Sequence, residues 1–416
     1  MKHIDKTQVG LDPSSTKRAS RFGLVLTLFL GIFASASNAQ ADPDRSDPAS
    51  GQTIRVALFN IWELSTDKIM NVDANGLGID PQARAAAEIL QKVRPDVLVI
   101  NEIDHDYENL GTDGSDYALN ARRFTDNYLA TGASPLSYPF AWAAPNNTGI
   151  LSGIDLNGDG YVATEADIGT QPHGNDSFGY GEYPGQFSMA VLSKYPIDEA
   201  SVRTFRELLW RDMPGNHIPK GFYSDEALAH FRLSSKSHQD VPILVDGRRI
   251  HLFLSHPTPI VFDAEEDRNG RRNWDEIRLW VDYLANADWM VDDQGQRGGY
   301  SKDEAFIIAG DLNARPDGTE SIYEGAPAIR QLLEHPRLQD PEVLVSEGAP
   351  AGQPSATAAF RGKGARIDYL LPSVELKIVD GAVFWPSAAT DPEGARQIEA
   401  ASDHRLVWLD LQLPTH

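Results

Sequence analysis

The sequence predicts a layered α/β domain, because strand-like and helix-like segments alternate along the chain. Residues 53–60 (TIRVALFN) and 96–101 (DVLVIN) are apolar runs typical of buried strands. Between them, residues 80–94 (DPQARAAAEILQKVR) begin with an Asp cap and an early Pro, the usual signals of a helix start. This β-α-β order indicates an α/β domain rather than an all-β sandwich.

The rest of the chain continues the same alternation without internal repeats. A helix is predicted over residues 268–286, where Trp274, Ile277, Val281 and Leu284 share one face. No segment between 53 and 416 is long or polar enough to act as a linker, so we expect a single domain over 53–416 with a sizeable core. Further strands are predicted at 187–193, 241–245, 250–255, 305–310, 366–371 and 404–412.

The first 41 residues have the features of a cleaved secretory signal peptide. Basic residues precede the apolar run 22–36, and the small-x-small motif AQA ends at Ala41. The run of about 15 apolar residues is shorter than the roughly 20 that a membrane-spanning helix needs, so no stable membrane anchor is expected after cleavage. Residues 42–52 would form a flexible leader, and the mature protein would be secreted or periplasmic.

Charge and cysteine content limit the classes of substrate and the kinds of covalent cross-link that this chain can have. Residues 1–41 carry a net charge of +3, so the formal charge of −23 becomes −26 after cleavage. Such a field repels polyanions, and no basic stretch with interleaved aromatic residues is present, so duplex nucleic acid is a disfavoured partner. Because the chain has no cysteine, disulfides and reactive thiols are excluded.

Residue types that can bind metals or transfer protons lie within or directly after the predicted strands. In IAGDLN, for example, Asp311 and Asn313 come directly after the strand 305–310. Asp and Asn also favour turns, so this hexapeptide alone leaves both interpretations open. The whole set has the composition of a divalent-metal site with a proton-transfer pair, and it consists of Asn60, Glu102, His256, Asp311, Asn313, Asp368, Asp403 and His404.

The order of these motifs resembles the endonuclease/exonuclease/phosphatase superfamily of metal-dependent phosphoesterases. The resemblance rests on FNIW, PDVLVINEID, GQFSMAVLSKYPI, LSHPTP, AGDLNARP, RIDYLLPS and SDHRLVWLD, in that order. It implies a four-layered α/β sandwich of two mixed sheets packed face to face, with helices outside and a metal at the sheet edge. Two motifs depart from the family pattern: Leu312 replaces the usual Phe, and Ser255-His256-Pro257-Thr258 replaces Asn-Thr-His-Leu.

The resemblance implies a metal-binding group. Glu102 would be the principal ligand of Mg²⁺ or Mn²⁺, with Asn60 as a neutral second ligand and Asp403 as a further one. For Asn60 and Asp403, a supporting position behind the ligands is the alternative.

The same resemblance implies a catalytic group. Asp311 would orient and deprotonate a water, with Asn313 donating to the water or the phosphate. His404 would donate to a non-bridging phosphate oxygen, with its tautomer fixed by Asp368, and His256 would act as a second cationic clamp.

A calcium-loop pattern occurs within an insertion at about 145–186. Asp155, Asn157, Asp159 and Gly160 match positions 1, 3, 5 and 6 of such a loop, but Ala166 stands at position 12. The pattern predicts a structural Ca²⁺ site, with a polar Asp-Gly turn as the alternative. The insertion is rich in glycine and aromatic residues and is expected to shape a wall of the active site.

A local basic cluster follows His256. Arg268, Arg271 and Arg272 stand at the start of the helix predicted over 268–286, where they would bind a second phosphate of the substrate. Pairing with the many neighbouring carboxylates is the equally weighted alternative.

Together these patterns predict a secreted or periplasmic, Mg²⁺-dependent hydrolase of phosphate mono- or diesters that uses a water nucleophile. An extracellular nuclease is one alternative, although the acidic charge counts against it. A calcium-dependent, non-catalytic binding protein on the same fold is the other. The patterns indicate neither the leaving group nor the oligomeric state.

Overall fold

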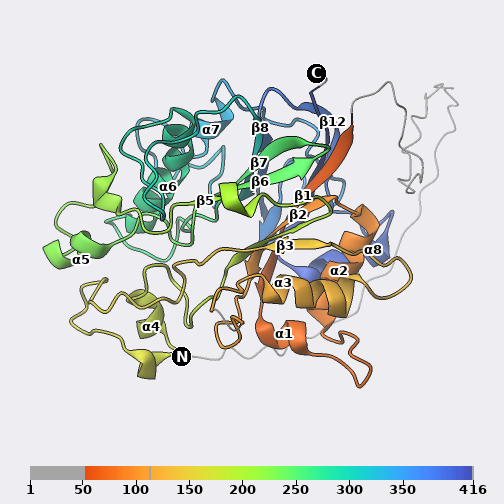
Figure 1. Ribbon diagram of the computed structural model, residues 1–416, viewed down its shortest axis with the longest axis horizontal. Helices are drawn as coiled ribbons and strands as arrows, with labels where there is room; N and C mark the ends of the chain where they lie inside the picture. Colours follow the sequence, from red (N-terminus) through yellow and green to blue (C-terminus); the bar gives the residue numbers. More distant parts are fainter. Residues whose placement is uncertain (1–51, 112–113, 415–416) are drawn as a thin grey trace, which may run out of the picture. The chain divides into compact units, whose positions relative to one another are not determined.

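The computed structural model describes residues 52–111 and 114–414, which belong to one compact unit, Pro48–His416 (Figure 1). The signal peptide predicted for residues 1–41 lies outside the described residues, as does the leader up to Gly51. Among the described helices, none combines the length and apolarity needed to cross a bilayer.

The first sheet is mixed and has six strands in the order β12-β13-β1-β2-β4-β3. Its central pair, β1 and β2, is parallel and is connected through helix α2, which confirms the predicted β-α-β unit. The other pairs are antiparallel. The strand bounds are β12 (Lys377–Val383), β13 (Val407–Gln412), β1 (Thr53–Leu64), β2 (Val97–Ile103), β4 (Met189–Ser193) and β3 (Phe140–Trp142).

The second sheet is also mixed and has five strands in the order β11-β8-β7-β6-β5. Here β7 and β8 are the parallel pair, and helix α6 (Arg268–Leu284) connects them. The strand bounds are β11 (Asp368–Pro372), β8 (Ala305–Asp311), β7 (Arg248–Leu254), β6 (Gln239–Val245) and β5 (Arg203–Thr204).

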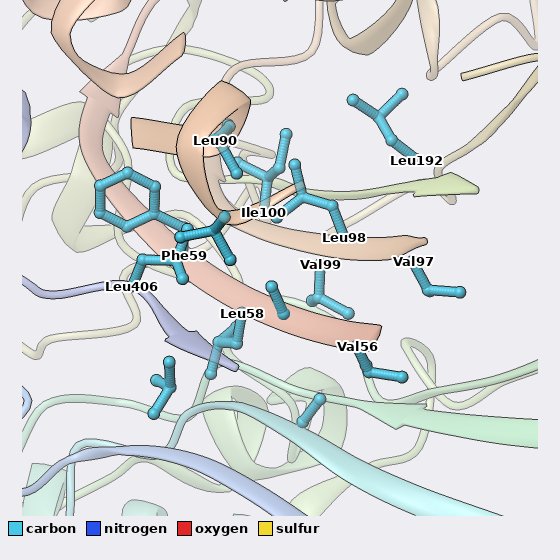
Figure 2. Close-up of a cluster of buried hydrophobic side chains, with 14 of the residues drawn as sticks. Val56, Leu58, Phe59, Leu90, Val97, Leu98, Val99, Ile100, Leu192 and Leu406 are labelled. Atoms are coloured by element: carbon cyan, nitrogen blue, oxygen red, sulfur yellow. The ribbon is translucent and has the colours of Figure 1, made fainter. Parts of the chain in front are cut away.

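The two sheets pack face to face because their central strands are apolar on both sides. On β7, Leu252 belongs to the core that includes the first sheet, whereas the next residue, Phe253, packs against Trp280 of α6 with ring centroids 5.2 Å apart. In Figure 2, Leu58 and Val99 of the first sheet point to one side, while Ile100 points to the side occupied by α2. Helices therefore cover the outer face of each sheet, and the predicted four-layered α/β sandwich is confirmed.

Local sequence signals account for the helix boundaries. Helix α2 (Pro81–Val93) begins where the Asp80 carboxylate accepts from the backbone N–H groups of Gln82 and Ala83, both at 3.0 Å, and Pro81 occupies the first turn. It ends at Arg94, whose φ of 53° is left-handed. Both ends agree with the predicted helix.

Short elements complete the described chain. They are the α-helices α1 (Thr66–Met70), α3 (Leu119–Phe124), α4 (Gln171–Asn175), α5 (Asp225–His230), α7 (Arg330–Leu333) and α8 (Pro392–Ala401), the π-helix η1 (Thr125–Leu129), the 3₁₀ turns η2 (Glu165–Asp167), η3 (Glu199–Ser201) and η4 (Trp210–Asp212), and the hairpin of β9 (Ala358–Phe360) and β10 (Lys363–Ala365).

Two predicted strand ends differ from the structure. Strand β1 continues to Leu64 through an irregularity in its pairing with β2 after Asn60, so Asn60 lies within the strand and not at its margin. Asp368 opens β11, whereas the sequence placed it inside a strand. In both cases the boundary of the strand depends on hydrogen bonds to a partner strand. The local sequence pattern carries no information about that partner.

We predict that Leu252→Ala lowers the free energy of unfolding by about 2–5 kcal/mol, because Leu252 is fully buried between the two sheets. Val379 on the edge strand β12 is 54% exposed, and Val379→Ala should cost less than about 1 kcal/mol. Urea denaturation of both variants checks this, and equal costs would contradict a core between the sheets.

Candidate active site

Strands of both sheets bring polar side chains together at one edge of the sandwich. The amide of Asn60, from β1, donates to Glu102 Oε1 on β2 at 2.9 Å and to Asp311 Oδ2 on β8 at 3.1 Å. The backbone N–H of Asp311 in turn donates to Asn101 Oδ1 at 2.9 Å. Two asparagines of the first sheet therefore hold the Asp311 of the second sheet in place.

Two residues of this edge have left-handed backbones that favour glycine. Glu102 has a φ of 63° and Asn313 a φ of 51°. The backbone N–H of Glu63 donates to Glu102 Oε2 at 3.1 Å, and Asn313 donates from its N–H to Asp311 Oδ1 at 2.9 Å and from its amide to the carbonyl of Pro257 at 3.1 Å. Strained conformations that are fixed by several hydrogen bonds are typical of functional sites.

His404 and Asp368 form a buried pair on the second sheet's side of the site. Asp368 lies opposite Asp311 in the antiparallel register of β11 and β8. The Nδ1 of His404 lies 3.0 Å from Asp368 Oδ2, which also accepts from Thr357 Oγ1 at 2.7 Å. In this contact the Nδ1–H of His404 donates to the Asp368 carboxylate. The Nε2 of His404 then faces Asp311 Oδ2 at 3.7 Å.

Burial and charge shift the pKa values of this group. Burial raises the pKa of Asp311 to about 7, and the negative charges of Asp368 and Glu102 act in the same direction, against the opposing effect of His404. Burial alone would lower the pKa of His404, but the carboxylates of Asp368 and Asp311 outweigh it and raise that pKa to about 10. At neutral pH, Asp311 can therefore accept a proton and His404 is a cation.

His256 lies close to the carboxylates of Asp311 and Glu102, and its pKa is lowered. Its Nε2 is 3.5 Å from Asp311 Oδ2 and 4.0 Å from Glu102 Oε1. Burial lowers the pKa of His256 well below its ordinary value, and the positive charges of Lys236 and His404 lower it further. This direction favours a neutral imidazole, and the cationic clamp predicted for His256 stays a prediction.

The residues at this edge fit a divalent metal ion. In the described part of the chain, two overlapping groups have converging ligand atoms: Glu102, His256 and Asp311 form one, and Asp311, Asp368 and His404 form the other. In the second group the pKa of His404 is raised to about 10, which favours the protonated imidazole over a metal ligand. In the first group, the carboxylates of Glu102 and Asp311 are oxygen ligands of the kind that Mg²⁺ or Mn²⁺ prefers.

The two other predicted ligands lie nearby in different roles. The amide oxygen of Asn60 accepts from the backbone N–H of Trp62 at 3.1 Å, so Asn60 presents its NH₂ to the carboxylates. The Oδ1 of Asp403 lies 3.9 Å from His404 Nε2 and is buried without a hydrogen-bond partner among the described residues. Asp403 lies outside the two converging groups of acidic and histidine side chains, and the ligand roles of Asn60 and Asp403 stay predictions.

Several residues of the site carry no sequence signal that separates them from ordinary loop or strand residues. Thr357 orients Asp368, and Asn101 holds Asp311. Trp62 and Phe360 are 51% and 43% exposed at the margin of the site, where the ring of Phe360 contacts His404 edge-on at 5.8 Å. For two of these residues the sequence offers a positional signal. Asn101 directly precedes Glu102, and Trp62 follows Asn60 by two residues.

The candidate calcium loop has its carboxylates bonded to its own backbone. Asp155 accepts from the N–H groups of Gly158 and Gly160 at 2.7 and 2.8 Å, and the Asn157 amide donates to Asp159 at 2.9 Å. These contacts are those of a polar turn. The Ca²⁺ site at this loop stays a prediction.

The three arginines after His256 do not converge. Arg272 is buried, and its guanidinium donates to the carbonyls of Leu233, Phe178 and Arg232. Arg268 pairs with the Glu266 carboxylate at 3.4 Å, while Arg271 donates to the Glu266 carbonyl at 2.9 Å. These contacts favour the alternative of internal pairing over a second phosphate site.

Comparison with solved structures gives a consistent set of similar folds at low identity. An endonuclease/exonuclease/phosphatase from Beutenbergia cavernae is 18% identical over 87% of this chain and 72% of its own, with a TM-score of 0.47. Sphingomyelinase C from Streptomyces griseocarneus is 14% identical over 86% and 98%, with a TM-score of 0.43. Beta toxin from Staphylococcus aureus, solved with bound magnesium ions, is 16% identical over 86% and 99%, with a TM-score of 0.42.

No curated protein matches the chain. The model of the Endonuclease/Exonuclease/phosphatase family, in contrast, matches residues 57–404, which include every residue of the carboxylate and histidine groups described above. The members of this family are generally hydrolytic phosphoesterases or nucleases. The chain belongs to the Endonuclease/Exonuclease/phosphatase family.

Proposed function

We propose that the protein hydrolyses phosphate mono- or diesters with a divalent cation, Mg²⁺ or Mn²⁺, and a water nucleophile. The observation that carries this proposal is the position of Asp311. Its Oδ2 accepts from Asn60 and lies 3.5 Å from His256 and 3.7 Å from His404, with a pKa of about 7. A buried carboxylate of this pKa, surrounded by hydrogen-bond donors and a cation, is suited to take a proton from water.

Each side chain has a task in this reaction. Asp311 accepts a proton from a water, whose oxygen attacks phosphorus as the bond to the leaving oxygen breaks. His404, protonated and oriented by Asp368, donates from Nε2 to a non-bridging phosphate oxygen, where negative charge increases. Glu102 would hold a divalent cation, which would supply Lewis-acid polarisation of the phosphoryl oxygen.

Two features guide the choice of substrate within this proposal. The acidic charge supports small esters over duplex nucleic acid, so the extracellular nuclease remains the second candidate. The signal-peptide pattern of residues 1–41 supports action outside the cytoplasm. The buried acid-base pair of Asp311 and His404 argues against the non-catalytic binding protein, which would have no use for it.

We expect Asp311→Asn to lower kcat by roughly 10² to 10⁴, because it removes the proton acceptor but keeps the side-chain shape. Asp246→Asn is the matched control, since Asp246 is exposed in the turn between β6 and β7. The measurement is steady-state hydrolysis of a panel of phosphomonoesters, phosphodiesters, lipid phosphodiesters and plasmid DNA with Mg²⁺. If folded Asp311→Asn keeps more than about a tenth of wild-type turnover, Asp311 is not the base.

The pKa values predict the pH profile of kcat/KM. The rate should rise as pH passes about 7, where Asp311 loses its proton, and fall as pH passes about 10, where His404 loses its own. Because a bound cation stabilises the Asp311 carboxylate, more Mg²⁺ should move the acid limb to lower pH. In His404→Gln the alkaline limb should vanish, and its persistence would exclude His404 as the group responsible.

Glu102→Gln should raise the Mg²⁺ concentration needed for half-maximal activity by about tenfold or more, because it weakens a ligand of the converging group. Asp403→Asn should have a smaller effect, since Asp403 lies outside that group. Activity is measured against Mg²⁺ concentration for both variants, with circular dichroism as the test of folding. An unchanged Mg²⁺ requirement in Glu102→Gln would rule out Glu102 as a ligand.

A further inference from the structure

Lys236 is a largely buried lysine whose ammonium has no partner among the described residues. It lies in the loop before β6, and its relative exposure is 7%. Within the described part of the chain, its ammonium makes neither an ion pair nor a hydrogen bond. Lys194, in contrast, is 36% exposed at its side chain and pairs with Asp96 at 2.9 Å.

An arrangement of this kind is unfavourable for the folded protein alone. Moving an ammonium out of water costs several kcal/mol, and the cost is offset only by well-placed counter-charges or acceptors. A lysine that is largely buried and has no such partner leaves its ammonium available to water or to a ligand from outside the chain.

The position of Lys236 identifies where that partner would lie. Its neighbour Ser235 donates from its hydroxyl to the His256 carbonyl at 3.3 Å, which fixes this loop against the His256 loop. Burial lowers the pKa of Lys236, and the carboxylates of Glu102, Glu276 and Asp311 counteract it. The ammonium therefore lies within electrostatic range of the candidate active site.

The neighbouring carboxylates are already engaged with other donors. Glu276 accepts from the backbone N–H of Ser235 at 2.6 Å and from that of Thr258 at 2.7 Å. Asn60 donates to both Glu102 and Asp311. These carboxylates provide long-range attraction for the ammonium but no direct contact.

We propose that Lys236 binds the phosphate group of the substrate, with a non-bridging oxygen as the missing partner of its ammonium. This inference rests on the proposed function. A lysine ammonium is a compact charge with three donors, which suits contact with a tetrahedral phosphate. Together with His404, it places a second protein cation at the group that becomes more negative during the reaction.

The test compares Lys236→Met with the matched control Lys194→Met. Methionine keeps most of the length of the side chain, so Lys236→Met should fold with a thermal midpoint equal to or above that of the wild type, because an unpaired buried charge is removed. We expect kcat/KM to fall by about a hundredfold and the inhibition constant of inorganic phosphate to rise by about tenfold or more. Lys194→Met should change neither value, and Lys236→Arg should restore part of the activity.

The outcomes separate this inference from the proposed function. If the wild type hydrolyses no ester of the panel, the proposed function fails. If the wild type is active and folded Lys236→Met keeps kcat/KM and phosphate inhibition within about threefold, the proposed contact with phosphate is wrong, because a lost charge-assisted contact costs more. If both Lys236→Met and Lys236→Gln fail to fold, the ammonium has a structural role and the inference is overturned.

Discussion

The arrangement of the candidate active site depends on one side chain, the amide of Asn60. It donates to Glu102 from its own sheet and to Asp311 from the other sheet, at 2.9 and 3.1 Å. These two carboxylates would otherwise repel one another in a buried environment, where charge interactions are poorly screened. A shared donor reduces the repulsion and fixes the relative position of the two sheets at the edge where the reaction is proposed to occur.

This edge is destabilising for the fold, and the core offsets the cost. Asp311 is buried with a raised pKa, Glu102 has a left-handed backbone, and Lys236 is largely buried with no partner for its ammonium among the described residues. Each is unfavourable by about 1–3 kcal/mol or more. The burial of apolar side chains between the sheets and under α6 offsets this cost. The site itself lies where the parallel strand pairs of the two sheets end.

The sequence predicted the parts of the structure that local patterns encode. The strand-helix-strand unit of β1, α2 and β2 follows from apolar runs and the Asp80 cap, and the family motifs gave the order of the catalytic side chains. The lowered pKa of His256 could not be predicted, because it results from burial, from Lys236, 20 positions earlier in the chain, and from His404. The donor role of Asn60 likewise depends on the Trp62 N–H beyond an irregularity in β1.

The cations of the site also resolve an apparent conflict between an acidic protein and an anionic substrate. At physiological salt, charges farther away than about 8 Å are largely screened when they are exposed to solvent. A small ester at the site would therefore interact mainly with His404, Lys236 and a bound divalent ion, and little with the net negative charge of the chain, which is −23 over the full sequence. A duplex would extend over many surface carboxylates as well. This distribution of charge supports the proposal that the substrate is a small phosphate ester and not an extended polyanion.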